Sequence, residues 1–286
     1  MKMKTNNKIM RIIMAVLLAL SAGLAFFRFD MLKDNKAIDS IGLYTDKSAG
    51  NLFGTLVFVL IAITVVFAFL LKKNTFESKK SSVLFTASSV ICMLLVLTVG
   101  ISGIYELIQN GKQNAILTAE GALGVGTNWL LVIETALAFV SVAYFLYEVI
   151  KGARTEVSGI LALIPVVWLA MRAIRLFMNI ETQINSSARS FTLLFIVVTM
   201  MFFIYEAELS IPKGKKEITE DANATRYAKL TGFGLVCAEL AIIFALAPIA
   251  AGGLDLTELV YGFADIALAL FALVRVFSLS IKSSEE

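Results

Sequence analysis

Long apolar blocks, separated by short polar segments, are the dominant pattern along this chain. Each block is about as long as the roughly 20 residues that an α-helix needs to cross about 30 Å of hydrocarbon. A soluble core would show shorter amphipathic stripes instead. The pattern predicts an all-α fold, a polytopic transmembrane helix bundle that forms a single integral membrane domain over residues 1–286. We expect eight spans, near residues 12–27, 51–71, 82–107, 128–150, 158–178, 191–208, 230–250 and 256–279.

Composition supports this class and narrows the chemistry. Hydrophobic residues make up 58% of the chain and charged residues 16%, against about 45–50% and about 25% in soluble domains. The absence of histidine removes the commonest general base and the usual zinc ligand. Cys92 and Cys237 both lie within apolar blocks, which favours two small buried hydrophobes over a disulfide or a metal site. We therefore expect no cofactor, no metal and no nucleic-acid partner.

The distribution of basic residues predicts the orientation. With the N-terminus inside, the inner segments carry 16 lysines and arginines and the outer segments carry six. This bias favours both termini in the cytoplasm. The first block follows a basic stretch and lacks a clear small-x-small cleavage site. It is therefore predicted to be an uncleaved signal anchor rather than a cleaved signal peptide.

The segments between the blocks are too short to form a second domain. The longest, near residues 28–50 outside and 210–229 inside, cannot bury a core of their own. The chain has no G-x-S-x-G elbow and no histidine for a triad. Gly214-Lys215 lacks the upstream glycine and the following Ser or Thr of a P-loop. No catalytic set is visible, so we expect that the protein is not an enzyme.

Two acidic residues fall near the middle of the last two blocks. Glu239 lies about 13 residues before the centre of the turn at 251–254, and Asp265 about 13 residues after it. At 1.5 Å per residue both are about 15–20 Å from that turn, near the bilayer midplane. If they face the same gap, they form a paired carboxylate site of the kind that a proton- or cation-coupled carrier uses. Alternatively, each hydrogen-bonds to a neighbouring helix and helps to hold the bundle.

A second charged group falls in the outer half of the membrane. Glu134, Arg172 and Arg175 reach similar depths, and the two arginines share one helix face because they are three residues apart. We expect an ion pair between Glu134 and one arginine. The second arginine would then either reach the outer surface or bind an anionic substrate or a lipid head group.

A third group lies at the inner edge of the blocks. It contains three acids and one base, namely Glu148, Glu206, Glu208 and Arg275. These residues predict either an electrostatic latch on the cytoplasmic side or side chains that only reach the head groups.

Two segments, in the fifth and sixth blocks, are 162–172 (ALIPVVWLAMR) and 202–208 (FFIYEAE). They resemble a pattern in uncharacterised multi-pass membrane proteins of low-GC Gram-positive bacteria. The resemblance implies no activity and no site residue. Together with the Lys- and Asn-rich loops, it favours a bacterial plasma membrane.

Two functional hypotheses follow. In the first, the protein is a proton- or cation-coupled small-solute transporter or permease, in which Glu239 and Asp265 handle the proton or cation. Glu134, Arg172 and Arg175 would then gate or bind the solute. In the second, it is a noncatalytic scaffold, sensor or accessory subunit of a membrane complex. The expected partners are the lipid bilayer, a small solute or ion, and another membrane protein.

Overall fold

A computed structural model of the chain describes residues 7–33, 38, 44–72, 76–78, 83–119, 128–151, 156–178, 187–210 and 220–281. The described elements are, in chain order, α1 (Asn7–Leu32), α2 (Lys47–Leu71), β1 (Phe76–Ser78), α3 (Val83–Ala119), α4 (Trp129–Lys151), α5 (Glu156–Leu161), α6 (Leu163–Met178), α7 (Ser187–Ser210), α8 (Glu220–Ala241), the π-helix η2 (Ile242–Leu246), α9 (Ala247–Ala251), α10 (Leu256–Phe277) and β2 (Leu279–Ile281).

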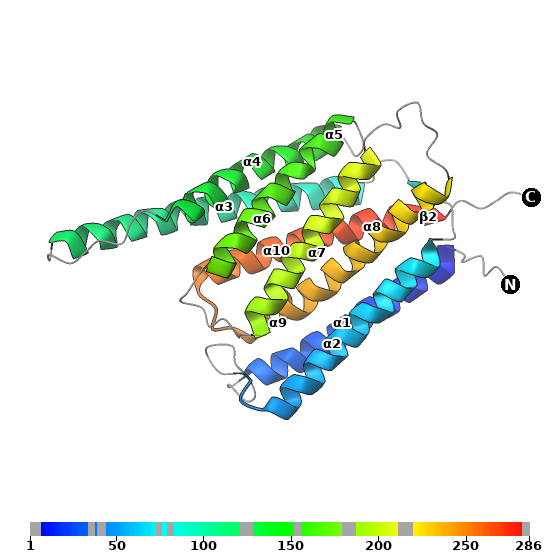
Figure 1. Ribbon diagram of the computed structural model, residues 1–286, viewed down its shortest axis with the longest axis horizontal. Helices are drawn as coiled ribbons and strands as arrows, with labels where there is room; N and C mark the ends of the chain where they lie inside the picture. The colour runs from blue at the N-terminus through cyan, green and yellow to red at the C-terminus, as the bar shows by residue number, and fades with distance from the viewer. Residues whose placement is uncertain are drawn as a thin grey trace, which may run out of the picture.

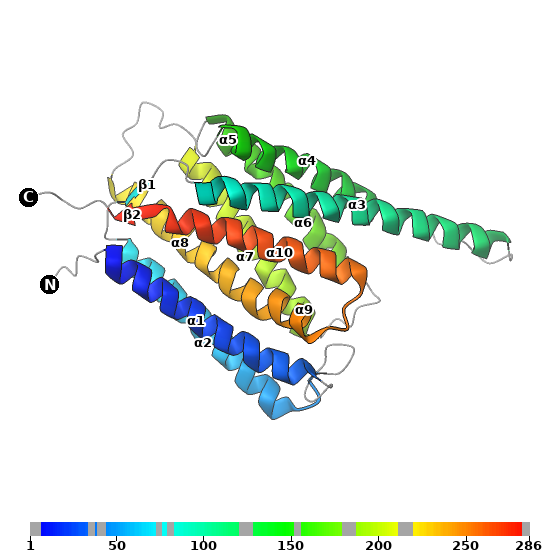
Figure 2. The same ribbon diagram turned by 180° about the vertical axis from the view of Figure 1, so that it is seen from behind.

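Eight helical segments in the described part of the chain are long and apolar enough to cross a membrane. The predicted all-α bundle of eight spans is therefore confirmed. The two strands are three residues each and pair with one another antiparallel, which leaves the class unchanged. Figures 1 and 2 show the start of α1 and the strand β2 at the same end of the bundle, as an even number of spans requires. The cytoplasmic location of that end stays a prediction.

The predicted boundaries are least accurate where a helix continues beyond its apolar block. The first span runs over Asn7–Leu32 rather than 12–27, and α3 continues to Ala119 rather than ending near 107. Helical hydrogen bonds do not stop at the edge of the hydrocarbon, so hydropathy marks the membrane-crossing part and not the helix end. In Figures 1 and 2 the C-terminal part of α3 extends well beyond the other helices.

The first two helices form a unit at one side of the bundle, which we call the N-terminal hairpin (α1 and α2). It packs on α8, η2 and α9, as Figure 1 shows. The remaining helices contact one another in a closed series, α3 with α4 and α10, α4 with α6, α6 with α7, α7 with α8, and α8 with α10. Helices α8 and α10 therefore lie at the centre of the fold.

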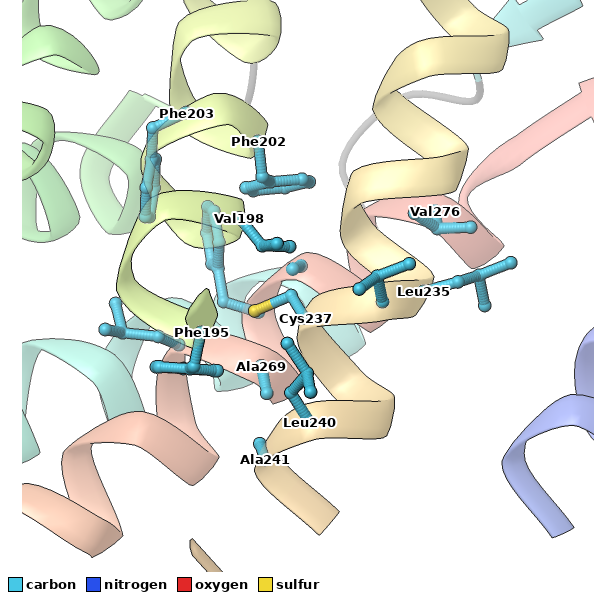
Figure 3. Packing of buried hydrophobic residues seen from close by; sticks show 14 of the residues in the cluster. Phe195, Val198, Phe202, Phe203, Leu235, Cys237, Leu240, Ala241, Ala269 and Val276 are labelled. Carbon is cyan, nitrogen blue, oxygen red and sulfur yellow. The ribbon is translucent and has the colours of Figure 1, made fainter. Parts of the chain in front are cut away.

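The centre of the bundle is filled by aromatic and small apolar side chains. Figure 3 shows Phe202 of α7 directed toward α8, and Phe203 on another side of α7. The rings of Phe203 and Phe271 stack with their centroids 5.9 Å apart. A Cβ at Gly234 would collide with the Val276 side chain, so glycine lets α8 and α10 approach closely. Small residues commonly serve this purpose between membrane helices.

The outer turn between α9 and α10 is fixed by local chemistry. Gly252 and Gly253 adopt positive φ angles of 79° and 84°, which other residues rarely adopt. The next helix starts with a capping box in which the Asp255 side chain accepts from the Glu258 backbone N–H at 2.7 Å. This turn sets where α10 begins, and so where its polar residues lie along the bundle.

Candidate functional site

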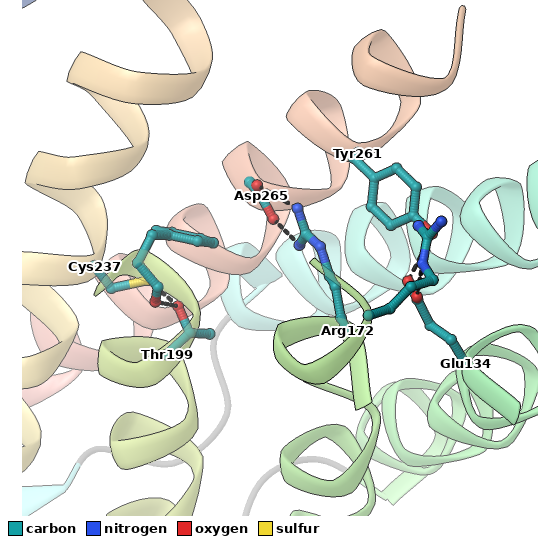
Figure 4. A network of polar contacts seen from close by, with 8 residues as sticks. Glu134, Arg172, Thr199, Cys237, Tyr261 and Asp265 are labelled. Carbon is teal, nitrogen blue, oxygen red and sulfur yellow. Dashed lines mark hydrogen bonds and ion pairs between the residues drawn. The ribbon is translucent and has the colours of Figure 1, made fainter. Parts of the chain in front are cut away.

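The half of the bundle that is predicted to face outward contains a buried ion pair between α6 and α10. Both terminal nitrogens of Arg172 donate to the two carboxylate oxygens of Asp265, with Nη2 and Oδ2 2.8 Å apart (Figure 4). The two side chains are 7% and 9% exposed. A bidentate guanidinium–carboxylate pair is the strongest geometry available to these groups. It occupies both oxygens of Asp265.

The second arginine of α6 connects three further helices. Arg175 Nε donates to Glu134 of α4, and its Nη2 donates to the Tyr261 hydroxyl of α10 at 2.8 Å. That hydroxyl in turn donates to Glu134 Oε1 at 2.6 Å. Arg175 Nη1 also lies 3.5 Å from an oxygen of Glu106 on α3. We call the six residues that link α3, α4, α6 and α10 the outer network: Glu106, Glu134, Arg172, Arg175, Tyr261 and Asp265.

Residue spacing explains how this network assembles. Arg172 and Arg175 are three residues apart on α6, and Tyr261 and Asp265 are four apart on α10, so each pair occupies one helix face. When these faces meet, both guanidinium groups lie over the Tyr261 ring. The distance from Cζ to the ring centre is 4.7 Å for Arg172 and 5.5 Å for Arg175. Cation–π attraction adds to the hydrogen bonds. The result is a rigid polar layer inside an apolar bundle.

The sequence predicted only part of this network. The expected pairing of Glu134 with an arginine is present, through Arg175. The expectation that one arginine would be left over is wrong, because Arg172 is bound by Asp265. Since both arginines face carboxylates, neither is available as a free anion site in this arrangement.

Glu239 lies in a different environment, where α8 meets the N-terminal hairpin. Its side chain is fully buried. Oε1 accepts a hydrogen bond from the Thr64 hydroxyl of α2 at 2.6 Å, and Oε2 has no hydrogen-bond partner. Among the described residues, no salt bridge includes Glu239. An uncompensated charge here would be costly, so this carboxyl is stable only when it is neutral or bound to a cation.

Of the two alternatives for Glu239 and Asp265, the shared site is therefore wrong, and each carboxyl instead bonds to a neighbouring helix, as the second alternative has it. Counting residues from a turn estimates the depth of a side chain but not its direction around the helix axis. Glu239 points from α8 toward α2, whereas Asp265 points from α10 toward α6. The two acids face different neighbours.

The backbone beside Glu239 is irregular. The π-helix η2 starts at Ile242, three residues after Glu239, and Pro248 follows in α9. Proline has no N–H to donate to the preceding turn and its ring clashes with the carbonyl four residues earlier, which accounts for a local widening of the helix. Such π-bulges often occur at functional sites.

Three of the four inner-edge residues, Glu148, Glu206 and Arg275, lie around Tyr144 and interact with it electrostatically. The fourth, Glu208, has a different partner. Arg275 of α10 donates to Glu206 of α7 at 2.8 Å, and both are almost fully buried. Glu208 pairs instead with Arg226 of α8 at 2.8 Å, and both of these side chains are partly exposed. Glu148 is buried on α4 and interacts electrostatically with Tyr144. The buried Arg275–Glu206 pair joins α7 to α10.

Three contributors were not recognised in the sequence as site residues. Thr64 is a single hydroxyl in an apolar block, with no signal beyond its polarity. Glu106 lies near the end of the third predicted span and Arg28 was assigned to a loop. In the structure Arg28 belongs to α1 and is 2% exposed. A charged residue at the end of an apolar block is the signal that would have identified both.

No protein-family model matches this chain, and no curated protein or solved structure matches it either. The evidence for function therefore comes from the geometry of the chain itself. It contains a saturated outer network and a carboxyl at the hairpin contact with unused hydrogen-bonding capacity.

Proposed function

We propose that this multi-pass membrane protein is a proton- or cation-coupled carrier of a small solute, with Glu239 as the coupling carboxyl. The observation that carries the proposal is the state of Glu239, which is fully buried, bonded only through Oε1 and without a basic partner among the described residues. An ionisable group at this depth is expensive unless it serves transport or pairs with another group. A bound proton or monovalent cation neutralises it.

Asp265 is a weaker candidate for the same role. Its two oxygens already receive both Nη groups of Arg172, so proton binding would have to break a bidentate ion pair. Glu239 can take up or release a proton at Oε2 without breaking the hydrogen bond that Oε1 accepts from Thr64. The coupling role therefore moves from a carboxylate pair to a single residue.

The surroundings of Glu239 suggest which part moves. The N-terminal hairpin meets the rest of the bundle through α8, η2 and α9. A π-helix and a proline lie in that contact, where backbone hydrogen bonding is already irregular. Carriers expose a central site alternately by moving one helix group against another. We assign the moving group to the N-terminal hairpin and the fixed group to the helices joined by the outer network.

A noncatalytic scaffold or accessory subunit is the second candidate, and one feature favours it. The described buried arginines of α6 and α10, Arg172 and Arg275, are both paired with acids across helix contacts. Such pairs act as fixed ties and need no substrate. In this case Glu239 would be a neutral hydrogen-bonding residue that holds α2 on α8.

Proton flux through reconstituted vesicles distinguishes the two. Wild-type protein in vesicles loaded with a pH-sensitive dye should move protons when a potassium diffusion potential is applied, alone or with a panel of small solutes. Glu239→Gln should abolish this movement, whereas Glu208→Gln, on the partly exposed inner edge, should leave it intact. Equal flux in wild type and Glu239→Gln would exclude the coupling role. Flux no greater than that of empty vesicles, with stable co-purification of another membrane protein, would favour the scaffold.

A further inference from the structure

A buried arginine near the end of α1 has nitrogens without acceptors. Arg28 lies four residues before the helix ends at Leu32 and is 2% exposed. Its Nε and Nη1 have no hydrogen-bond partner. Buried polar groups are nearly always hydrogen-bonded, and a charged donor loses more than a neutral one when it is not. These donors therefore have the capacity to bind an acceptor from outside the chain.

Aromatic rings hold the guanidinium in a fixed position. Its carbon lies 4.6 Å from the centre of the Phe244 ring in η2 and 5.7 Å from that of Phe53 in α2. The Phe53 and Phe244 rings also contact one another edge to face, at 5.9 Å. Cation–π attraction holds the charge without using the N–H groups as donors to oxygen. The guanidinium is thus positioned by three helical segments while two nitrogens stay unbonded.

The hydroxyl of Tyr44 lies beside the Arg28 guanidinium. The buried Tyr44 hydroxyl interacts with Arg28 electrostatically and through weak hydrogen bonding, but no hydrogen bond of good geometry joins the two side chains. The Tyr44 ring is packed against Gly50 at the start of α2, where a Cβ would overlap it. Asp30 is only two residues from Arg28, but it lies on an exposed face of α1. The described surroundings of Arg28 thus offer hydrogen-bond donors rather than a carboxylate.

We propose that Arg28 and Tyr44 form a binding site for a phosphate group at the outer end of the N-terminal hairpin. Four residues from the helix end correspond to about 6 Å, which is the level of the lipid head groups. Arginine suits phosphate because it stays charged and presents several N–H donors. The ligand is the phosphate of an outer-leaflet lipid or a free phosphate anion. The site is separate from Glu239 and does not depend on transport.

Thermal unfolding in dodecyl maltoside micelles, which carry no phosphate, tests the site and separates the two sources of phosphate. One series adds inorganic phosphate, or chloride at equal ionic strength. The other adds phosphatidylglycerol, or a glycolipid without a phosphate group, in phosphate-free buffer. The variants are Arg28→Gln, Tyr44→Phe and the control Arg11→Gln, which removes an exposed arginine from the same helix.

Phosphate or phosphatidylglycerol should raise the unfolding temperature of wild type and Arg11→Gln but not of Arg28→Gln. Stabilisation by inorganic phosphate identifies a free anion, and stabilisation by phosphatidylglycerol alone identifies a lipid. Tyr44→Phe keeps the ring packing but loses one hydrogen bond to a charged group. It should therefore raise about tenfold the phosphate concentration that gives half of the stabilisation. It keeps the test decisive if Arg28→Gln does not fold.

Three results would overturn the site. The first is no stabilisation of wild type by either phosphate source. The second is an equal response in Tyr44→Phe and wild type. The third concerns Asp34 and Asp39, which lie outside the described residues. If the double variant Asp34→Asn/Asp39→Asn reproduces the stability loss of Arg28→Gln in phosphate-free buffer, the chain itself supplies the partner of Arg28.

Discussion

The outer network and the contact between the N-terminal hairpin and α8 both contain ionisable groups inside the bundle, but they satisfy them differently. In the outer network each arginine faces at least one carboxylate, and Tyr261 bridges Arg175 to Glu134. At the hairpin contact, Glu239 and Arg28 are both buried. Among the described residues, no salt bridge includes either of them. Acidic and basic side chains are present in both regions, yet only one region pairs them.

This difference suggests a division of roles. A saturated ion-pair network resists rearrangement because removing one partner leaves an uncompensated charge in a medium of low dielectric. A carboxyl with one free oxygen can change its protonation or its partner with little loss. We therefore expect substitutions in the outer network to lower stability strongly, and substitutions at Glu239 to change activity more than stability.

Breaking the Arg172–Asp265 pair should have the largest effect. Asp265→Asn leaves the Arg172 guanidinium buried without its counter-charge, and removing one member of a buried pair typically costs about 3–5 kcal/mol. The free energy of unfolding, measured by SDS titration in bicelles, should fall by this amount. The double variant Arg172→Leu/Asp265→Leu should recover much of the loss because no isolated charge remains. A single variant as stable as wild type would show that the pair is not a structural tie.

Removing the bridging hydroxyl of the outer network should have a smaller effect. Tyr261→Phe keeps the ring between the two guanidinium groups but deletes the hydrogen bonds to Arg175 and Glu134. Because the Arg175–Glu134 ion pair persists, we expect a loss of about 1–2 kcal/mol in the same SDS titration. Tyr105→Phe, on an exposed face of α3, is the matched control and should be neutral. An equally neutral Tyr261→Phe would mean that the hydroxyl is not part of the network.

The fold could be predicted because hydropathy reports one strong physical requirement. A helix that crosses hydrocarbon must be apolar over its crossing length, so eight apolar blocks give eight spans. Where helices continue into the aqueous layer, as α3 does toward Ala119, this requirement no longer applies and the ends were misjudged. The inclusion of Arg28 in α1 was missed for the same reason.

The site was only partly predictable because contacts depend on rotation about each helix axis. The i, i+3 spacing of Arg172 and Arg175 correctly placed both on one face. Counting residues from the loop between the two helices correctly predicted that Glu134 lies at the same depth as Arg175. The same counting gave Glu239 and Asp265 equal depths but could not show that α8 and α10 turn them toward different helices. One sequence contains the residue spacing within each helix, whereas the pairing of faces arises from packing of the whole bundle.

Thr64 provides the smallest and sharpest test of the contrast. Thr64→Val removes the hydroxyl that donates to Glu239 while keeping the shape of the side chain. Interhelical hydrogen bonds in membrane proteins average about 0.6 kcal/mol, so we expect a loss of that order in the SDS titration. Thr55→Val on the same helix is the control, because its hydroxyl bonds only to the backbone of its own helix at Asn51.

A double-mutant cycle with Glu239→Leu isolates the contact. In the Glu239→Leu background, Thr64→Val should cost no more than the control, because the hydrogen bond is already absent. Glu239→Leu itself should be neutral or stabilising, since a leucine carries no polar group to desolvate. A loss above about 2 kcal/mol for Glu239→Leu would exceed what one such bond supplies and would make Glu239 a structural tie like Asp265. The division between a fixed outer network and an adjustable hairpin contact would then fail.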